Sequence, residues 1–109
     1  MAGVLGAFEQ AVLLAVLRLR DDAYGAAIVT EVEARLRRCV AIGAVHATLV
    51  RLEEKRLVSS RTAPGDQQRA GRPRRYYTLE PRGLRALAEA RQALTHMWRG
   101  FRLPLPEDA

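Results

Sequence analysis

Apolar residues in the first half of the chain recur with the spacing of three consecutive helices. In residues 5–19 they wrap most of the circumference, which predicts a helix buried on several sides. Asp21 and Asp22 break this run, and we expect them to cap a second helix at about Ala23–Arg37. A third helix is expected at about Gly43–Lys55. The predicted inward stripe of this third helix is Ile42, Val45, Leu49 and Leu52.

Two short strand-like runs follow the third helix, at Leu57–Thr62 and Arg75–Leu79. The connecting segment, Ala63–Arg74, is rich in Pro, Gly, Gln and Arg and is longer than a tight turn. A helix followed by a basic hairpin is the arrangement with which a winged helix grips a nucleic-acid duplex.

The last apolar pattern predicts a long helix from Pro81 to about Arg102, ended by the Leu-Pro repeat that follows. Twenty-two residues of helix are about 33 Å long, which is too long for so small a body to cover. We therefore expect its apolar seam to meet a second subunit, the alternative being that it folds back on the first helix. The seam comprises Leu84, Leu87, Leu94, Trp98 and Phe101, with Arg91 as its polar position.

The predicted fold class follows from this order of elements. It is mainly α with a small two-stranded β-hairpin, in the form of a winged helix-turn-helix followed by a C-terminal dimerisation helix. The expected organisation is a winged-helix domain at residues 1–80, the dimerisation helix at 81–103 and a short tail at 104–109.

Charge and composition point to an acidic partner. The 109 residues have a formal net charge of +6, and Lys55 is the only lysine among 18 basic residues. Arginine forms bidentate bonds to phosphate and to guanine, which suits a DNA-binding protein, although a GC-rich genome produces the same bias. Nucleic acid is the first expectation and an anionic membrane the second.

The single cysteine, Cys39, allows no intrachain disulfide and no cysteine-based metal site, so a reduced cytoplasmic location is expected. Residues 4–17 are apolar but too short to span a membrane, and no signal peptide is recognised. We expect no membrane association.

No catalytic constellation is found. His46 and His96 lie in different predicted helices without a neighbouring metal ligand, and Ser60 has no adjacent base. Glu53 and Glu54 are adjacent on a helix, point about 100° apart, and are expected to form surface ion pairs with Lys55 or Arg51. The chain is therefore expected to be no enzyme and to need no cofactor or metal.

Positively charged and small residues define a candidate DNA-binding surface. The third helix has small residues mixed with basic ones on its predicted outward face, and arginines cluster at the hairpin. A protein-binding winged helix with a solvated loop is the alternative. The candidate contacts are Ala44, His46, Ala47, Thr48, Arg51, Lys55, Arg61, Arg69, Arg72, Arg74 and Arg75.

Three segments in the same order resemble the PadR transcriptional regulators. Asp22–Ile28 (DAYGAAI) is similar to the second helix of that family, and Gly43–Val58 (GAVHATLVRLEEKRLV) to its recognition helix and exit. Arg74–Gly83 (RRYYTLEPRG) is similar to its second wing strand and the start of the last helix. The resemblance extends over about residues 5–101.

The resemblance implies a homodimeric repressor that binds a pseudo-palindromic operator in double-stranded DNA and is released by an effector. The third helix would enter the major groove, with Ala44, Ala47, Thr48 and Arg51 nearest the bases. It also suggests a small aromatic effector near Trp98 and Met97, the alternative for Trp98 being seam packing. Remaining alternatives are a module that binds another regulator or a polymerase subunit, and RNA binding.

This chain departs from the family pattern at three positions. His46 stands where the family usually has Tyr, which puts a DNA contact there in doubt. Arg56 stands where Gly is usual, and a positive φ there would cost about 1 kcal/mol. Glu80 stands where a Thr-like cap is usual, although its charge still suits a helix N-terminus.

Overall fold

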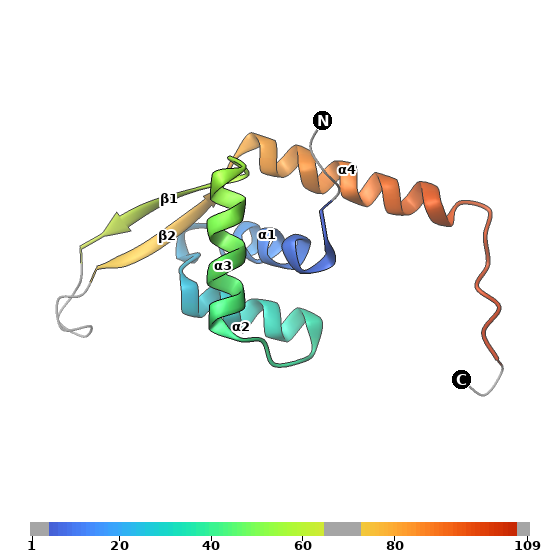
Figure 1. The fold of residues 1–109 in the computed structure, drawn as a ribbon, viewed down its shortest axis with the longest axis horizontal. Coiled ribbons are helices and arrows are strands. Elements are labelled where there is room, and N and C mark those ends of the chain that lie inside the picture. The colour runs from blue at the N-terminus through green and yellow to red at the C-terminus, as the bar shows by residue number, and fades with distance from the viewer. Residues whose placement is uncertain (1–4, 65–72, 107–109) are drawn as a thin grey trace.

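The computed structural model describes residues 5–64 and 73–106 of the chain. Three helices, a two-stranded hairpin and a fourth helix follow one another (Figure 1). The hairpin and the fourth helix extend from opposite sides of the three-helix body. The elements are α1 (Ala7–Leu19), η1 (Arg20–Asp22), α2 (Gly25–Leu36), α3 (Ile42–Glu54), β1 (Val58–Ala63), β2 (Arg74–Leu79) and α4 (Pro81–Trp98).

The core lies between α1, α2 and α3. Val12, Leu13 and Val16 of α1 are fully buried, as are Ile28 and Val32 of α2, because each set repeats at helical spacing. The predicted helix at 5–19 is thus confirmed, but Leu14 and Leu17 on its other side remain exposed in the single chain.

The two acidic residues before α2 do not cap it. Asp21 and Asp22 form the short 3-10 turn η1, and the N-cap position of α2 is Tyr24, which makes no side-chain capping bond. The expected cap was therefore wrong. The next residue, Ala23, makes a long-range contact through its backbone: its carbonyl oxygen accepts a hydrogen bond from the Tyr77 N–H at 2.8 Å.

The expected inward stripe of α3 is correct at three of its four positions. Val45, Leu49 and Leu52 are buried, whereas 64% of Ile42 is exposed. Ile42 is the first residue of the helix, so it lies at the edge of the body rather than over the core. Thr48, expected on the outward face, is only 1% exposed. The spacing explains this, because Thr48 lies three residues after Val45 and four before Leu52.

β1 and β2 pair antiparallel from Val58–Leu79 to Ala63–Arg74, which confirms the predicted hairpin with bounds shifted by one residue. Besides the bond from Tyr77 to Ala23, the hairpin contacts the helical body through the bridge between Tyr24 and Tyr76 and through the bond from Ser60 Oγ to Glu53 Oε2, at 2.7 Å. Glu53 therefore bonds to the hairpin rather than to Lys55 or Arg51 as expected.

The turn between α3 and β1 has a positive φ at Arg56, the position at which the family that the chain resembles usually has glycine. Arg56 has a φ of 62°, in the left-handed region that disfavours residues with a Cβ. Its N–H donates to Glu53 O at 2.9 Å, and the next residue, Leu57, donates to Leu52 O. These bonds end α3 and direct the chain into β1.

α4 begins where the sequence predicted and ends earlier. Pro81 is its first residue, Glu80 is the N-cap without a side-chain bond, and Gly83 lies against the backbone oxygen of Leu57. The helix ends at Trp98 rather than at about Arg102, because Gly100 has a φ of 72° and reverses the chain. The 18 helical residues span about 27 Å.

Candidate nucleic-acid interface

The exposed side of α3 presents small and apolar side chains. Ala44, His46 and Ala47 are exposed, as predicted for the outward face. Gly43 has open space around its Cα, so another molecule could approach the backbone closely there. Thr48 is excluded from this face by its burial.

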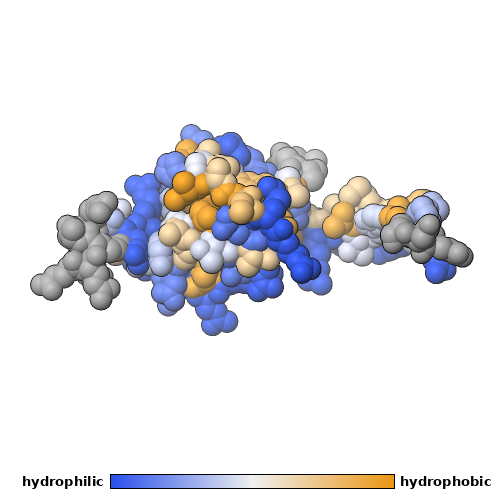
Figure 2. Space-filling model, turned by 90° about the horizontal axis from the view of Figure 1, so that it is seen from below, coloured by the Kyte–Doolittle hydropathy of each residue, from blue (hydrophilic) through white to orange (hydrophobic). Residues whose placement is uncertain are grey.

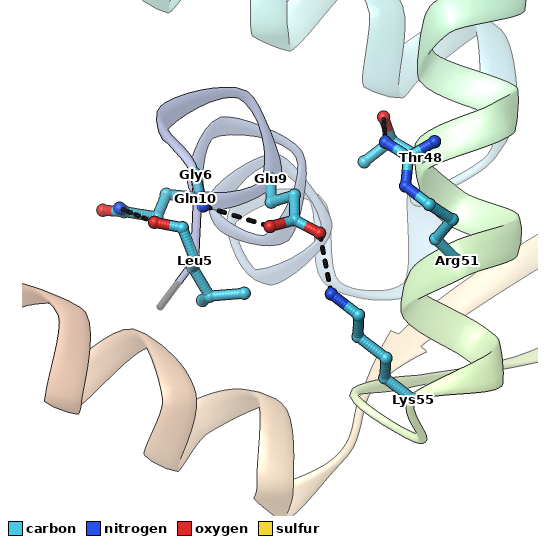
Figure 3. A network of polar contacts seen from close by, with 7 residues as sticks. All are labelled: Leu5, Gly6, Glu9, Gln10, Thr48, Arg51 and Lys55. Carbon is cyan, nitrogen blue, oxygen red and sulfur yellow. Dashed lines mark hydrogen bonds and ion pairs between the residues drawn. The ribbon is translucent and has the colours of Figure 1, made fainter. Parts of the chain in front are cut away.

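The two basic residues near the end of α3 are exposed, and each is engaged with another side chain (Figure 3). Arg51 Nη2 donates to Thr48 Oγ1 at 3.1 Å, and Lys55 Nζ pairs with Glu9 Oε2 at 3.2 Å. Lys55 is thus engaged in an ion pair, so Glu9 partly neutralises the charge that Lys55 would otherwise add to the positive surface of α3.

Glu9 links the start of α1 to the end of α3. Its Oε1 accepts the Gly6 N–H at 3.0 Å while its Oε2 binds Lys55. Burial alone would raise the pKa of Glu9, but the Gly6 bond, Lys55 and the charge of Arg51 together hold the pKa below its ordinary value. Glu9 is therefore favoured as a carboxylate that neutralises part of this basic side of α3.

The loop-side half of the hairpin holds two arginines against two tyrosine rings. The guanidinium carbon of Arg74 lies 3.9 Å from the Tyr24 ring centroid, and that of Arg61 lies 4.8 Å from the Tyr76 centroid. The two rings meet edge to face with centroids 5.7 Å apart. Stacking on a ring holds a guanidinium by its face and so limits the directions in which its N–H groups point.

The remaining predicted hairpin contacts divide into two groups. Arg75 is exposed on β2. Arg69 and Arg72 lie outside the described residues. The structure thus brings Arg61, Arg74 and Arg75 together on one hairpin.

Tyr24 and Tyr76 were not among the predicted site residues. Each lies within a segment noted for its family resemblance, but neither has a charge or a nucleophilic group that draws attention. The signal that could have found Tyr76 is the Arg-Arg-Tyr-Tyr run at residues 74–77, in which Arg74 and Tyr76 lie two positions apart on one face of a strand and can stack with neighbouring side chains.

A hollow of about 330 Å³ separates the start of α3 from the hairpin. Its floor is mainly apolar, and His46, Arg74 and Arg75 line it as well. His46 therefore lies between the exposed face of α3 and the hairpin arginines. The lining residues are Gly25, Ile42, Val45, His46, Leu49, Arg74, Arg75 and Tyr77.

Most of the predicted seam is exposed along α4 and just beyond its end. Leu84, Leu94, Trp98 and Phe101 are about half exposed or more, and Arg91 is exposed. Leu87 departs from the prediction, because it is half-buried and packs against the core of the same chain. Phe101 lies beyond the helix but its ring remains 6.2 Å from that of Trp98, centroid to centroid.

Trp98 also lines a second, shallow hollow at the end of α4. This space of about 430 Å³ is bordered by Leu94, Thr95, Trp98 and Arg99. Met97, the other residue expected near an effector, is 71% exposed and does not line it.

Residues 5–64 and 73–106 contain neither a candidate metal site nor a helix that could span a membrane. Within these ranges, His, Cys, Asp and Glu side chains form no group of three that could hold a metal ion. No helix in the described part of the chain has the length and apolar character needed to cross a membrane.

Comparison with known proteins agrees with this geometry. Residues 13–89 match the sequence model described as the transcriptional regulator PadR-like family. No curated protein sequence matches the chain.

Solved structures share the fold over most of the chain. A PadR-like transcription factor from Bacteroides fragilis is 27% identical, with a TM-score of 0.69, and the match covers 82% of this chain and 81% of that one. A PadR family transcription regulator from Clostridium difficile is 25% identical, with a TM-score of 0.66 and coverage of 84% and 91%. BpsR of Bordetella bronchiseptica, whose DNA binding is regulated by 6-hydroxynicotinic acid, is 19% identical, with a TM-score of 0.62 and coverage of 91% and 69%.

Proposed function

The chain belongs to the PadR-like family of transcriptional regulators, and from that premise we propose that it is a sequence-specific repressor that binds double-stranded DNA as a homodimer. Binding to DNA would place its action in the cytoplasm. The observation that supports this most directly is the pairing of an exposed, small-residue face on α3 with stacked arginines at the adjacent hairpin.

In this proposal α3 enters the major groove and the hairpin lies along the flanking backbone. Gly43, Ala44 and Ala47 allow the helix to approach the base edges, with His46 at the side of the groove. Arg61, Arg74 and Arg75 bind phosphates in this proposal, and Arg69 and Arg72, which lie between the two strands in the sequence, would do the same. Arg51 and Lys55 lie near the C-terminal end of α3, where they would add positive charge that Glu9 partly neutralises.

Dimerisation is proposed through the exposed side of α4. Leu84, Leu94 and Trp98 leave an apolar strip uncovered along a helix that extends from the body (Figure 1). A second copy related by a two-fold axis would cover it, and the two α3 helices would then meet half-sites about one helical turn apart, on the order of 10 base pairs.

Release by an effector is the third part of the proposal. The hollow at Trp98 lies beside the proposed dimer contact, so a planar aromatic compound bound there would alter the spacing of the two α3 helices. Trp98 is the only tryptophan of the chain, so its fluorescence reports on this position alone. Titration with a panel of planar aromatic compounds should give a saturable change, and its absence across the panel would remove the effector from the proposal.

The main experiment selects duplexes from a random library with the purified full chain. Enrichment of one pseudo-palindromic sequence supports the proposal, and binding to it should weaken steeply with salt because phosphates are neutralised. Arg74→Ala should weaken binding to all duplexes and make the salt dependence less steep. If no sequence is enriched, the exposed apolar residues of α3 favour the alternative of a protein-interaction module, which capture of polymerase subunits would test.

A further inference from the structure

The exposed face of α3 is more apolar than a basic DNA-binding protein requires. Ile42 is 64% exposed and Val50 42% exposed, with Gly43, Ala44 and Ala47 between them. On the side of the molecule formed by α2 and the start of α3, hydrophobic residues form a patch bordered by hydrophilic ones (Figure 2).

Polar groups that could hydrogen-bond to base edges are scarce on this face. Thr48 is buried, and its hydroxyl accepts a bond from Arg51. Lys55 is paired with Glu9. The exposed polar side chains of α3 are His46, at the hairpin side, Arg51, which donates to Thr48, and Glu54, at the far end of the helix. In the first two turns of α3, hydrogen-bond readout of base edges therefore depends on His46 alone.

We propose that Ile42 contacts the C5-methyl group of a thymine, so that this protein selects A·T pairs at the start of α3 by apolar contact. Thymine is the one base that presents a methyl group in the major groove, and apolar side chains are its natural partner. The inference rests on the proposed function, because it assumes that α3 lies in the major groove.

The position of Ile42 supports this assignment. It is the first residue of α3, and helix-turn-helix proteins contact base edges with the N-terminal residues of the recognition helix. It also lines the hollow between α3 and the hairpin, next to Arg74 and Arg75. A strand whose phosphates are bound by these arginines would bring its base edges toward Ile42 rather than toward the end of α3.

Val50 provides a matched comparison within the same helix. It is also apolar and exposed, but it lies eight residues farther along, about 12 Å from Ile42 along the helix axis. Its contact, if it makes one, therefore falls on a different base pair. Truncation of Val50 should leave a thymine contact at Ile42 intact.

The test combines base and side-chain substitution on the duplex enriched by selection. Each thymine is replaced in turn by deoxyuridine, which removes only the methyl group. We expect one position in each half-site at which this change weakens binding by about three- to fivefold. With Ile42→Ala the same replacement should have almost no effect, whereas Ile42→Leu and Val50→Ala should preserve it.

The outcomes separate this inference from the function on which it rests. If a duplex is enriched but no thymine is coupled to Ile42, the thymine contact is overturned while DNA binding stands. If the enriched duplex has no thymine in the part of each half-site that α3 contacts, the thymine contact is overturned as well. If no duplex is enriched, the proposed function itself fails, and the apolar face of α3 must serve another partner.

Discussion

The guanidinium carbon of Arg74 lies 3.9 Å from the centroid of the Tyr24 ring, which joins the hairpin to the N-cap residue of α2. Arg74 comes from β2, and Tyr24 also forms an isolated bridge with Tyr76 of the same strand. The contact therefore restricts the arginine to few conformations. A side chain that is already restricted loses less entropy when it binds a phosphate.

We expect Tyr24→Leu to weaken DNA binding while the protein remains folded. Loss of the cation–π contact should reduce affinity by about two- to fivefold, since such contacts at exposed sites contribute about 0.5–1 kcal/mol. Fluorescence anisotropy with one labelled duplex at fixed salt measures this change. The steepness of the salt dependence should stay the same, because Arg74 is still present and charged.

Tyr24→Phe is the matched control for this substitution, since it keeps the ring and removes only the hydroxyl. Its affinity should equal that of the natural chain. If Tyr24→Phe weakens binding as much as Tyr24→Leu does, the hydroxyl rather than the ring is responsible, and the stacking explanation is wrong.

The sequence predicted the order and type of all the main elements because each has a strong local signal. The helices follow from apolar spacing, and the hairpin follows from two β-prone runs around a Pro- and Gly-rich segment. Glycine is usual at the position of Arg56 in the family that the chain resembles, which raised the question of a positive φ there, and the structure shows one. These features depend on residues close together in the chain.

Errors arose where a side chain's environment depends on distant parts of the chain. Ile42 continues the apolar stripe of α3, but it is the first residue of the helix, and the rest of the chain leaves it exposed there. Thr48 is a different error, because its spacing from Val45 and Leu52 predicts burial while its polar side chain suggested the outward face. The pairing of Lys55 with Glu9 joins residues 46 positions apart, so no local pattern could reveal it. The Tyr24–Arg74 stack escaped prediction for the same reason.

Replacement of Arg56 by glycine should stabilise the protein. Its φ of 62° is unfavourable for any residue with a Cβ, whereas glycine adopts it freely. Relief of the left-handed conformation is worth about 1–2 kcal/mol, and the extra entropy that glycine gives the unfolded chain offsets part of this gain. We therefore expect a net increase in the free energy of unfolding of about 0.5–1 kcal/mol. Urea denaturation at a fixed protein concentration measures it.

Arg56→Ala separates the backbone effect from the loss of a positive charge. Alanine keeps the Cβ, so this variant should show no comparable gain. Equal stabilisation by glycine and alanine would mean that charge repulsion among the basic residues, and not backbone conformation, is relieved at this position.

Glu9 should make the stability of the fold depend on pH in the acidic range. Its pKa is lower in the folded state than in the unfolded chain, so the unfolded chain binds a proton at higher pH. The contribution of Glu9 is therefore present above its ordinary pKa and is lost as the pH falls below about 4.3.

Glu9→Gln should flatten this part of the profile. Urea midpoints measured between about pH 3 and pH 6 should fall less steeply toward acid in the variant than in the natural chain. Glu54→Gln is a suitable control, because Glu54 is exposed on α3 and its replacement should leave the slope unchanged. Parallel profiles for the natural chain and Glu9→Gln would show that other carboxylates cause the acid sensitivity.

Leu94→Glu should disrupt the proposed dimer without unfolding the chain. Leu94 is 51% exposed on α4, so the single chain does not depend on it for its core. In a two-fold dimer each substitution occurs twice, and burial of one leucine contributes about 1.5–3 kcal/mol. The dimer dissociation constant should therefore rise by at least about a hundredfold, as measured by sedimentation equilibrium.

Gln92→Glu supplies a control on the same helix. It adds the same charge, but at 3.6 residues per turn Gln92 points roughly 160° away from Leu94. It should leave the dimer intact. Leu94→Glu should also lose affinity for a full pseudo-palindrome while it keeps weak binding to a single half-site, because only the coupling of the two α3 helices is removed. A dimer that survives Leu94→Glu would place the subunit contact elsewhere, and the apolar strip of α4 would then need a different partner.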